Sequence, residues 1–443
     1  MYIFSSKKCQ LLDQSILATE SGSNHENLSV YFDVLKASLS NENYENTMFY
    51  QAYRQLCDKA QDSFRKKDKQ LWIAQYIDMH STDIGGPYRD SITQICSDIC
   101  STRLPLFILC PNGRTHSASN QDCWIPNVFP PNKSIPETFQ KQYRFVGQLM
   151  GLATRKKHYL NVKFAPLLWK ELLYEPITIH DIQAIDAQSF TLIHEVEQQI
   201  QQAMLFDTDA NTFDIFNSVL SEVHFEVVGS AQQTFELIPN GSQIPITAEN
   251  FSNYSFHYRQ YRLNEFHRQI DYIRQGLHSV VPSYYLNIFT AKELEEAVCG
   301  KGYIDVELLK RNTTYGDGYN QNAPVIDCFW KVMSEMFTEE QKKMLLVFAW
   351  GRSTLPIRDE DFSSKFKICK YHVQSDNIDH TLPRSHTCSF TIDLPEYSTL
   401  EIMHERLNCA ITYCSNIDGD GNMDAENVNY NDDSSSDDDD DDE

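Results

Sequence analysis

The segment Leu382–Phe390 holds the residues of this 443-residue chain that are best suited to covalent chemistry. Within it, Cys388 follows a proline-led loop and stands at the start of an apolar strand. A thiol becomes a good nucleophile when nearby positive charge favours its thiolate form, and Arg384 and His386 supply candidate charges. In an extended segment, residues 386 and 388 project to the same face. The alternative is a structural cysteine packed into a small domain, and spacing alone favours that alternative.

Other reactive signatures are missing from the sequence. We find no G-x-S-x-G elbow, no phosphate-binding loop, no H-E-x-x-H motif and no dinucleotide-binding glycine pattern. Several possible zinc ligands lie in one region, but their gaps do not match the paired C-x2-C units of known sites. These ligands are Cys96, Cys100, Cys110, His116 and Cys123. We therefore expect no metal and no cofactor, and we interpret the cysteines mainly as free, buried thiols.

The elements that must position Cys388 are two strands, near 365–373 and 387–393, together with the last helix. Ser398 and Glu401 have the S-x-x-E spacing of a capping box, which predicts that this helix starts there. Two further helices are expected before the strands, at about 324–336 and 338–350.

The first part of the chain is predicted to be mainly helical. Residues 1–27 are polar and are expected to be loosely ordered. Residues 28–68 are predicted to form one or two helices, since Phe32, Leu35 and Leu39 fall on one helical face.

A strand is predicted over 71–79 and a long helix over 145–160. Gly147 and Gly151 in this helix each cost about 1 kcal/mol against alanine, so we expect them to mark close packing against another element. The remaining expected elements are helices and strands over 164–173, 181–206, 222–247, 250–280 and 290–299.

Charge excludes some classes of partner. Asp and Glu number 62 against 38 Lys and Arg, which gives a formal net charge of −24. The segment 417–443 holds 13 of these acids and no base, and it should be disordered. A chain this acidic is not expected to bind nucleic acid or an anionic membrane surface. No run approaches the ~20 apolar residues of a membrane span, and no secretory signal stands at the start, so we expect a cytoplasmic protein.

Motifs spread in order over residues 70–412 together resemble the HECT domain of ubiquitin ligases. The matching segments are Asp83–Asp90, Phe145–Gly151, Ile244–Asn250, Phe289–Gly300, Thr314–Trp330 and Leu382–Ser398. Within the family, Pro111–Arg114 followed by Ile125–Asn127 looks most like the members that carry RCC1-like repeats.

The resemblance implies an α+β, bilobal fold with a large, mainly helical N-lobe and a small α/β C-lobe joined by a flexible hinge. The hinge would include Gly316 and Gly318. The implied boundaries are 1–69 for a partly helical N-terminal extension, 70–313 for the large lobe, 314–319 for the hinge, 320–412 for the small lobe and 413–443 for the acidic tail.

The resemblance also implies the chemistry of an E3 ubiquitin ligase. Cys388 matches the cysteine that accepts ubiquitin from an E2 enzyme as a thioester and passes it to a substrate lysine. His386 and Thr387 match the residues just before that cysteine and would position the thioester. Asp393 matches an acidic position that could orient or deprotonate the incoming lysine; a turn residue at a strand end is an equally good interpretation of it.

The implied partners are an E2 enzyme, ubiquitin and a protein substrate. By its order in the chain, the E2-docking part falls near 194–230, with ordinary core packing as the alternative for its apolar residues. These candidates are Met204, Leu205, Phe206, Phe213 and Phe216.

One departure from the family keeps a second function open. Many HECT chains have a phenylalanine near the C-terminus that assists transfer, and this sequence continues instead into its acidic segment. A HECT-like module that binds E2 or ubiquitin and transfers poorly is therefore the alternative to a ligase. A cysteine hydrolase would need a separate catalytic histidine and an oxyanion site, which nothing in the sequence specifies.

Overall fold

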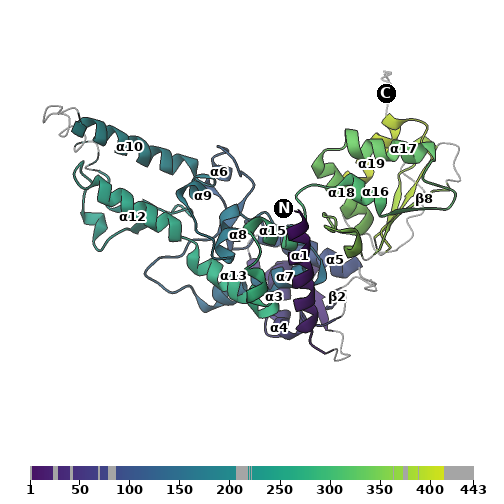
Figure 1. The fold of residues 1–443 in the computed structure, drawn as a ribbon, viewed down its shortest axis with the longest axis horizontal. Helices are drawn as coiled ribbons and strands as arrows, with labels where there is room; N and C mark the ends of the chain where they lie inside the picture. The colour runs from purple at the N-terminus through teal and green to yellow at the C-terminus, as the bar shows by residue number, and fades with distance from the viewer. Residues whose placement is uncertain are drawn as a thin grey trace, which may run out of the picture.

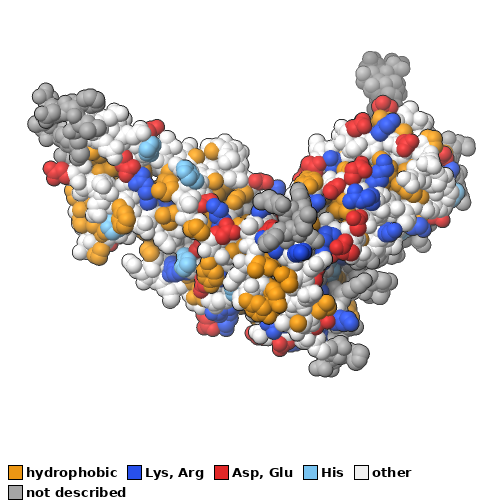
Figure 2. Space-filling model, in the orientation of Figure 1, with side chains coloured by type: hydrophobic (Ala, Val, Ile, Leu, Met, Phe, Trp, Pro, Cys, Tyr) orange, Lys and Arg blue, Asp and Glu red, His pale blue; other side chains and the backbone are white. Residues whose placement is uncertain are grey.

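The chain folds into two lobes that meet at the base of a wide notch (Figures 1 and 2). The computed structural model describes residues 2–22, 28–39, 43–67, 70–77, 86–205, 218, 220, 222–362, 364–372, 378–387 and 389–413. Buried hydrophobic residues form one cluster from Leu12 to Val298 and a second from Ile304 to Ile411. The expected α+β architecture with a large and a small lobe is confirmed.

The large lobe is built around the helix pair α7 and α13. Its α-helices are α1 (Tyr2–Ala18), α2 (Val34–Leu39), α3 (Met48–Leu56), α4 (Ala60–Ser63), α5 (Gly86–Ile99), α6 (Pro111–Arg114), α7 (Glu137–Lys156), α8 (Pro166–Leu172), α9 (Ile179–Gln183), α10 (Ala187–Leu205), α12 (Phe251–Asn264), α13 (His267–Val280), α14 (Ser283–Leu286) and α15 (Ala291–Cys299). Three small two-stranded sheets join them: β1 (Ser29–Phe32) with β2 (Ile73–Tyr76), β3 (Phe107–Leu109) with β4 (Trp124–Pro126), and β5 (Glu226–Val228) with β6 (Thr234–Glu236).

The glycines of α7 mark its contact with α13, as the sequence predicts. A Cβ placed on Gly147 would lie 1.8 Å from the carbonyl oxygen of Ile273. A Cβ on Gly151 would lie 2.5 Å from the Cβ of Val280. No real side chain tolerates such distances, so the close approach of the two helices explains both glycines and confirms this prediction.

The first 68 residues differ from the prediction in two respects. Residues Tyr2–Ala18 form helix α1 instead of a loose segment, and Leu12 and Ile16 are buried on its inner face. Residues Ser29–Phe32 form strand β1, which pairs in parallel with β2, so the expected helical face was wrong. Phe32 is indeed buried, but Leu35 and Leu39 are 67% and 75% exposed.

Helices α10 and α12 form an arm at the far end of the large lobe from the small lobe (Figure 1). An ion pair joins them, since the two terminal guanidinium nitrogens of Arg259 donate to the Glu197 carboxylate at 2.7 and 2.6 Å. At the base of the arm, the buried Arg262 binds Asp186 at 2.7 Å and Glu265 at 3.2 Å. These pairs fix the direction of the arm.

The small lobe is a four-stranded sheet with helices packed on one face. The strand order is β7 (Thr313–Gly316), β8 (Phe366–Lys370), β10 (Thr391–Leu394) and β9 (Arg384–His386). Only the β9–β10 pair is antiparallel. The helices are α16 (Val306–Arg311), α17 (Pro324–Lys331), α18 (Glu339–Trp350) and α19 (Leu400–Tyr413), and Val332–Met336 is a π-helical turn after α17.

The packing divides the lobes earlier than the expected boundary at 313. Leu309 of α16 belongs to the small-lobe cluster, and the backbone N–H of Ile304 donates to Glu339 of α18. Cys299 still packs on the large-lobe cluster. The connection between the lobes is therefore residues 300–303, while 313–316 is an edge strand of the small-lobe sheet.

The start of α19 also differs from the capping-box prediction. The Thr399 hydroxyl accepts the N–H of Ile402 at 3.2 Å, so Thr399 caps the helix. Ser398 instead donates its hydroxyl and its N–H to the Asp379 carboxylate.

A helix that crosses a membrane must be both long and apolar. None of the described helices meets both requirements.

Candidate active site

Cys388 lies outside the described residues, so the site is built from its neighbours. His386 ends strand β9, and Thr387 follows it. The N–H of Ser389 donates to the His386 carbonyl oxygen at 3.1 Å, and the Ser389 hydroxyl donates to the same oxygen at 3.2 Å. These bonds return the chain sharply from β9 into β10.

The structure brings together two of the predicted site residues, His386 and Asp393. Their side chains lie on neighbouring antiparallel strands, with the His386 Nε2 and the Asp393 Oδ2 2.9 Å apart. The imidazole is 53% exposed and the carboxylate 25% exposed. A carboxylate at this distance fixes the orientation of the imidazole ring, as the orienting acid does in a nucleophile–base–acid arrangement. The pair therefore presents an oriented imidazole at the solvent-facing surface of the sheet.

Phe390 fixes the other end of the return. It is fully buried and has a left-handed backbone with φ of 52°, a rare conformation for a non-glycine residue. Its ring stacks on the buried Trp350 with 4.1 Å between centroids and 8° between planes. Because Trp350 ends helix α18, this stack fastens the segment after Cys388 to the small-lobe core.

Cys369 of strand β8 is the one cysteine in the described strands of the small-lobe sheet. It pairs with Asp393 of β10 in the parallel register, and it hydrogen-bonds with Asp317 and Lys367. Burial raises the pKa of the Cys369 thiol to about 11, so it is protonated at neutral pH. It is a structural thiol, in contrast to the exposed surface that carries His386.

Two arginines form hydrogen bonds between the lobes close to Thr387, and neither was predicted as a site residue. Arg89 of α5 donates through Nη1 to the Thr387 carbonyl oxygen at 2.9 Å, a bond between residues 298 positions apart. Arg352, just after α18, donates in the opposite direction to the Lys157 carbonyl oxygen at 3.4 Å. The only sequence signal for this contact is that Arg89 lies in one of the family-like motifs.

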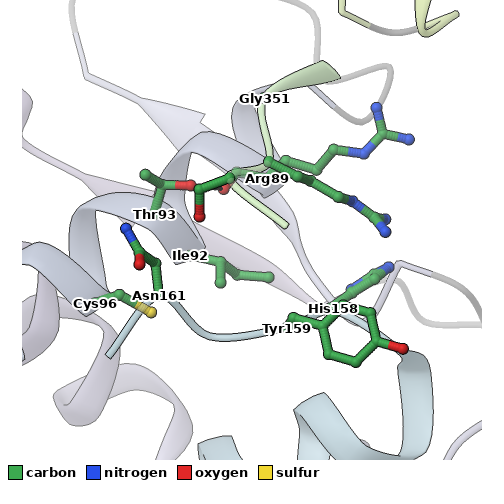
Figure 3. A pocket seen from close by; sticks show the side chains of 10 residues that line it. Arg89, Ile92, Thr93, Cys96, His158, Tyr159, Asn161 and Gly351 are labelled. Carbon is green, nitrogen blue, oxygen red and sulfur yellow. Dashed lines mark hydrogen bonds between the residues drawn. The ribbon is translucent and has the colours of Figure 1, made fainter. Parts of the chain in front are cut away.

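A hollow of about 20 Å³ lies at this junction, which we call the interlobe seam (Arg89, His158, Gly351 and Arg352). Figure 3 shows the Arg89 side chain directed to the same side as His158. Among the described residues that line the hollow, none is a carboxylate. Burial, and then the Arg89 charge, lower the pKa of Arg352 to about 9. Burial, followed by the charges of Arg352 and Arg89, also lowers the pKa of His158 well below its usual value.

The remaining predicted residues are placed as follows. Met204 and Leu205 belong to the end of helix α10, and nothing further is described of their side chains. Phe206, Phe213 and Phe216 lie outside the described residues. Gly316 ends strand β7, and Gly318 has a φ of 106° that favours glycine. Among the described residues, no group of three or more His, Cys, Asp or Glu side chains could hold a metal ion.

Comparison with known proteins identifies related chains. Residues 93–418 match the family profile of the HECT domain, described as a ubiquitin-transferase. The mouse and human E3 ubiquitin-protein ligase HERC2 are each 33% identical over 350 residues, which is 79% of this chain and 7% of HERC2. HERC2 is an RCC1-repeat HECT ligase, so the narrower resemblance is also confirmed.

More distant relatives cover a similar part of the chain. Human E3 ubiquitin-protein ligase NEDD4 is 27% identical over 376 residues, which is 84% of this chain and 26% of NEDD4. Schizosaccharomyces pombe E3 ubiquitin-protein ligase ptr1 is 28% identical over 368 residues, which is 82% of this chain and 10% of ptr1. The chain thus spans about a quarter or less of the length of these curated relatives.

Proposed function

The chain belongs to the HECT-domain family of ubiquitin transferases, and from this premise we propose that it is an E3 ubiquitin ligase that carries ubiquitin as a thioester on Cys388. The observation that carries the proposal is the His386–Asp393 pair at 2.9 Å on the exposed face of the small-lobe sheet. His386 lies two positions before Cys388 in the chain, and Asp393 lies five positions after it. A cysteine two positions from an oriented histidine in the sequence supports a nucleophile that works with a base.

The proposed reaction has two transfers. In the first, the Cys388 thiolate attacks the carbonyl carbon of the E2–ubiquitin thioester. A new C–S bond forms, the bond to the E2 sulfur breaks, and the E2 cysteine leaves as a thiolate. In the second, a substrate lysine that has lost its proton attacks the same carbonyl carbon. An amide bond forms, the C–S bond to Cys388 breaks, and the proton that the attacking nitrogen loses passes to the leaving Cys388 sulfur.

His386 and Asp393 act in the second transfer, in which a base must remove a proton from the substrate lysine. A lysine ammonium must lose a proton before its nitrogen can attack, and the His386 imidazole can accept that proton. Asp393 orients the ring for that proton transfer. We assign Thr387 a positioning role, because its carbonyl is held across the interlobe seam.

The proposed partners are an E2 enzyme, ubiquitin and a protein substrate, and the proposed compartment is the cytoplasm. HECT E3 ligases work with these three partners. The formal net charge of −24 argues against nucleic acid and anionic membranes as partners. We place E2 docking on the α10–α12 arm, near residues 194–230. The small lobe must then swing toward the arm for the first transfer, and we keep 314–319 as one candidate hinge.

One assay tests the proposal. The full chain is incubated with E1, a panel of E2 enzymes and ubiquitin, and adducts are separated with and without reductant. We expect a reductant-sensitive ubiquitin adduct that Cys388→Ala abolishes completely. Cys369→Ala is the matched control and should keep the adduct, because the Cys369 thiol is buried and its pKa is raised to about 11. No adduct with any E2 would reject the ligase and favour the binding module.

A further inference from the structure

We propose that Arg89 is a positioning residue for the second transfer, the discharge of ubiquitin from Cys388 to lysine. This inference rests on the proposed function and adds a step-specific role to a residue of the large lobe. Arg89 holds the carbonyl of Thr387, the residue directly before Cys388, through a bond of 2.9 Å. A charged donor makes a stronger hydrogen bond than a neutral one, so this contact can restrain the active-site segment.

The contact is one half of a reciprocal exchange across the seam. Arg89 belongs to the large lobe and donates to a small-lobe carbonyl, whereas Arg352 belongs to the small lobe and donates to the large-lobe carbonyl of Lys157. The Arg352 guanidinium also stacks 4.6 Å from the centroid of the Trp350 ring. The two lobes are thus held by a pair of opposed arginine–carbonyl bonds, one of which ends at the residue before the nucleophile.

The electrostatics of the seam argue for a purpose beyond stability. Two guanidinium groups share a partly buried hollow in which no described lining residue is a carboxylate, and the pKa of Arg352 is lowered to about 9. Packing like charges together costs free energy. A contact that served only to hold the lobes would be better made with an ion pair. The chain has such a pair elsewhere, where Asp13 of α1 binds both Lys157 and Arg358.

The Arg89 contact belongs to one arrangement of the lobes. In this arrangement the active-site segment lies against α5, and the α10–α12 arm is at the opposite end of the molecule (Figure 1). An E2 docked on the arm can reach Cys388 only if the small lobe moves away, which breaks the Arg89 bond. Arg89 should therefore assist discharge and be dispensable for loading.

The test separates the two transfers in single-turnover assays on the full chain. Loading is followed from E2–ubiquitin to the chain, and discharge is followed from the purified adduct over a series of lysine concentrations. For Arg89→Met we expect loading at the wild-type rate and a maximal discharge rate lower by about tenfold, with an unchanged lysine concentration at half-maximal rate. Arg89→Lys keeps the charge and one donor, so it should recover part of the rate.

Two control variants exclude a general structural effect. Arg144→Met removes a guanidinium from the exposed side of α7, where Arg144 binds Gln275, and it should discharge at the wild-type rate. Arg358→Met removes the tie to Asp13 without touching Thr387, and it should also discharge at the wild-type rate.

The outcomes separate this inference from the proposed function. Wild-type discharge by Arg89→Met would overturn the role of Arg89, and so would an equal defect in Arg358→Met, which would assign the effect to lobe tethering in general. Failure of the unmodified chain to load with any E2 would reject the proposed function itself.

Discussion

The two sides of the strand pair β9–β10 differ in a way that separates chemistry from support. On the sheet face, His386 and Asp393 are partly exposed and make a single hydrogen bond between strands. On the other side, Trp350 and Phe390 are fully buried and stacked face to face. An exposed ion pair contributes little to stability, usually below about 1 kcal/mol. A buried aromatic pair contributes several times more. Substitutions on the two sides should therefore affect different quantities.

The largest effect is expected on the buried side. Trp350→Ala should lower the free energy of unfolding of the small lobe by about 3–5 kcal/mol, because it removes a fully buried indole and leaves a cavity beside Phe390. Chemical denaturation followed by tryptophan and tyrosine fluorescence measures the change. Trp350→Phe is the matched variant and should cost less, since it keeps an aromatic ring and removes an indole N–H that has no partner among the described atoms. An unchanged unfolding midpoint for Trp350→Ala would contradict the comparison.

The next largest effect is expected on the exposed side. It should change the rate of ubiquitin discharge and leave the free energy of unfolding nearly unchanged. His386→Asn and Asp393→Asn should each slow discharge to lysine by about 100-fold, the range of a lost general base or of the group that orients it. Their unfolding free energies should stay within about 0.5 kcal/mol of the unmodified chain, because both side chains are partly exposed.

Arg384→Met is the control for this pair. Arg384 is exposed on the same strand and its guanidinium lies 4.8 Å from the centroid of the Tyr371 ring. Arg384→Met should keep the discharge rate and the stability; any effect of the Arg384 charge on the Cys388 thiolate is measured separately, in loading from E2. Discharge at the wild-type rate in His386→Asn would mean that the lysine loses its proton to solvent, and the face would then carry only the nucleophile.

The exposed side could be predicted from the sequence because its parts are close together in the chain. His386, Cys388 and Asp393 lie within eight residues, and the resemblance marks all three as site residues. Alternation along one strand predicts a shared face only for residues 386 and 388. His386 and Asp393 are an odd number of positions apart, and they share a face because β9 and β10 pair antiparallel. The tight contact at the two glycines of α7 could also be predicted. Glycine destabilises a helix interior relative to alanine, so its presence there implies close packing against another element. Local spacing carries this kind of information well.

Contacts between parts of the chain that are far apart in sequence could not be predicted in the same way. Arg89 meets Thr387 only when two lobes come together, and no periodicity connects residues 298 positions apart. Helix α1 was missed because its stability comes from tertiary contacts, such as Arg155 donating to the carbonyl of Ile16. Strand β1 was missed because its partner β2 lies more than 40 positions further along the chain.

The smallest effect concerns the joint that would let the seam open. Residues 300–303 connect the two hydrophobic clusters, and a Cβ on Gly302 would meet no atom within 4 Å. Gly302→Pro should therefore fold normally while it restricts one backbone rotation. We expect it to slow loading from E2 by about threefold and to leave discharge unchanged, because only loading requires the lobes to part.

Gly316→Pro tests the alternative hinge at 314–319. Gly316 lies at the end of strand β7, where a Cβ would sit 2.8 Å from the Lys367 side chain and 3.3 Å from the Cys369 sulfur. If the rotation occurs at 300–303, this variant should lose small-lobe stability without a specific loading defect. If instead Gly316→Pro slows loading more than Gly302→Pro at equal stability, the pivot lies inside the small-lobe sheet. Strand β7 must then separate from β8 each time the chain is charged, and the seam would open by unpairing an edge strand instead of by turning a linker.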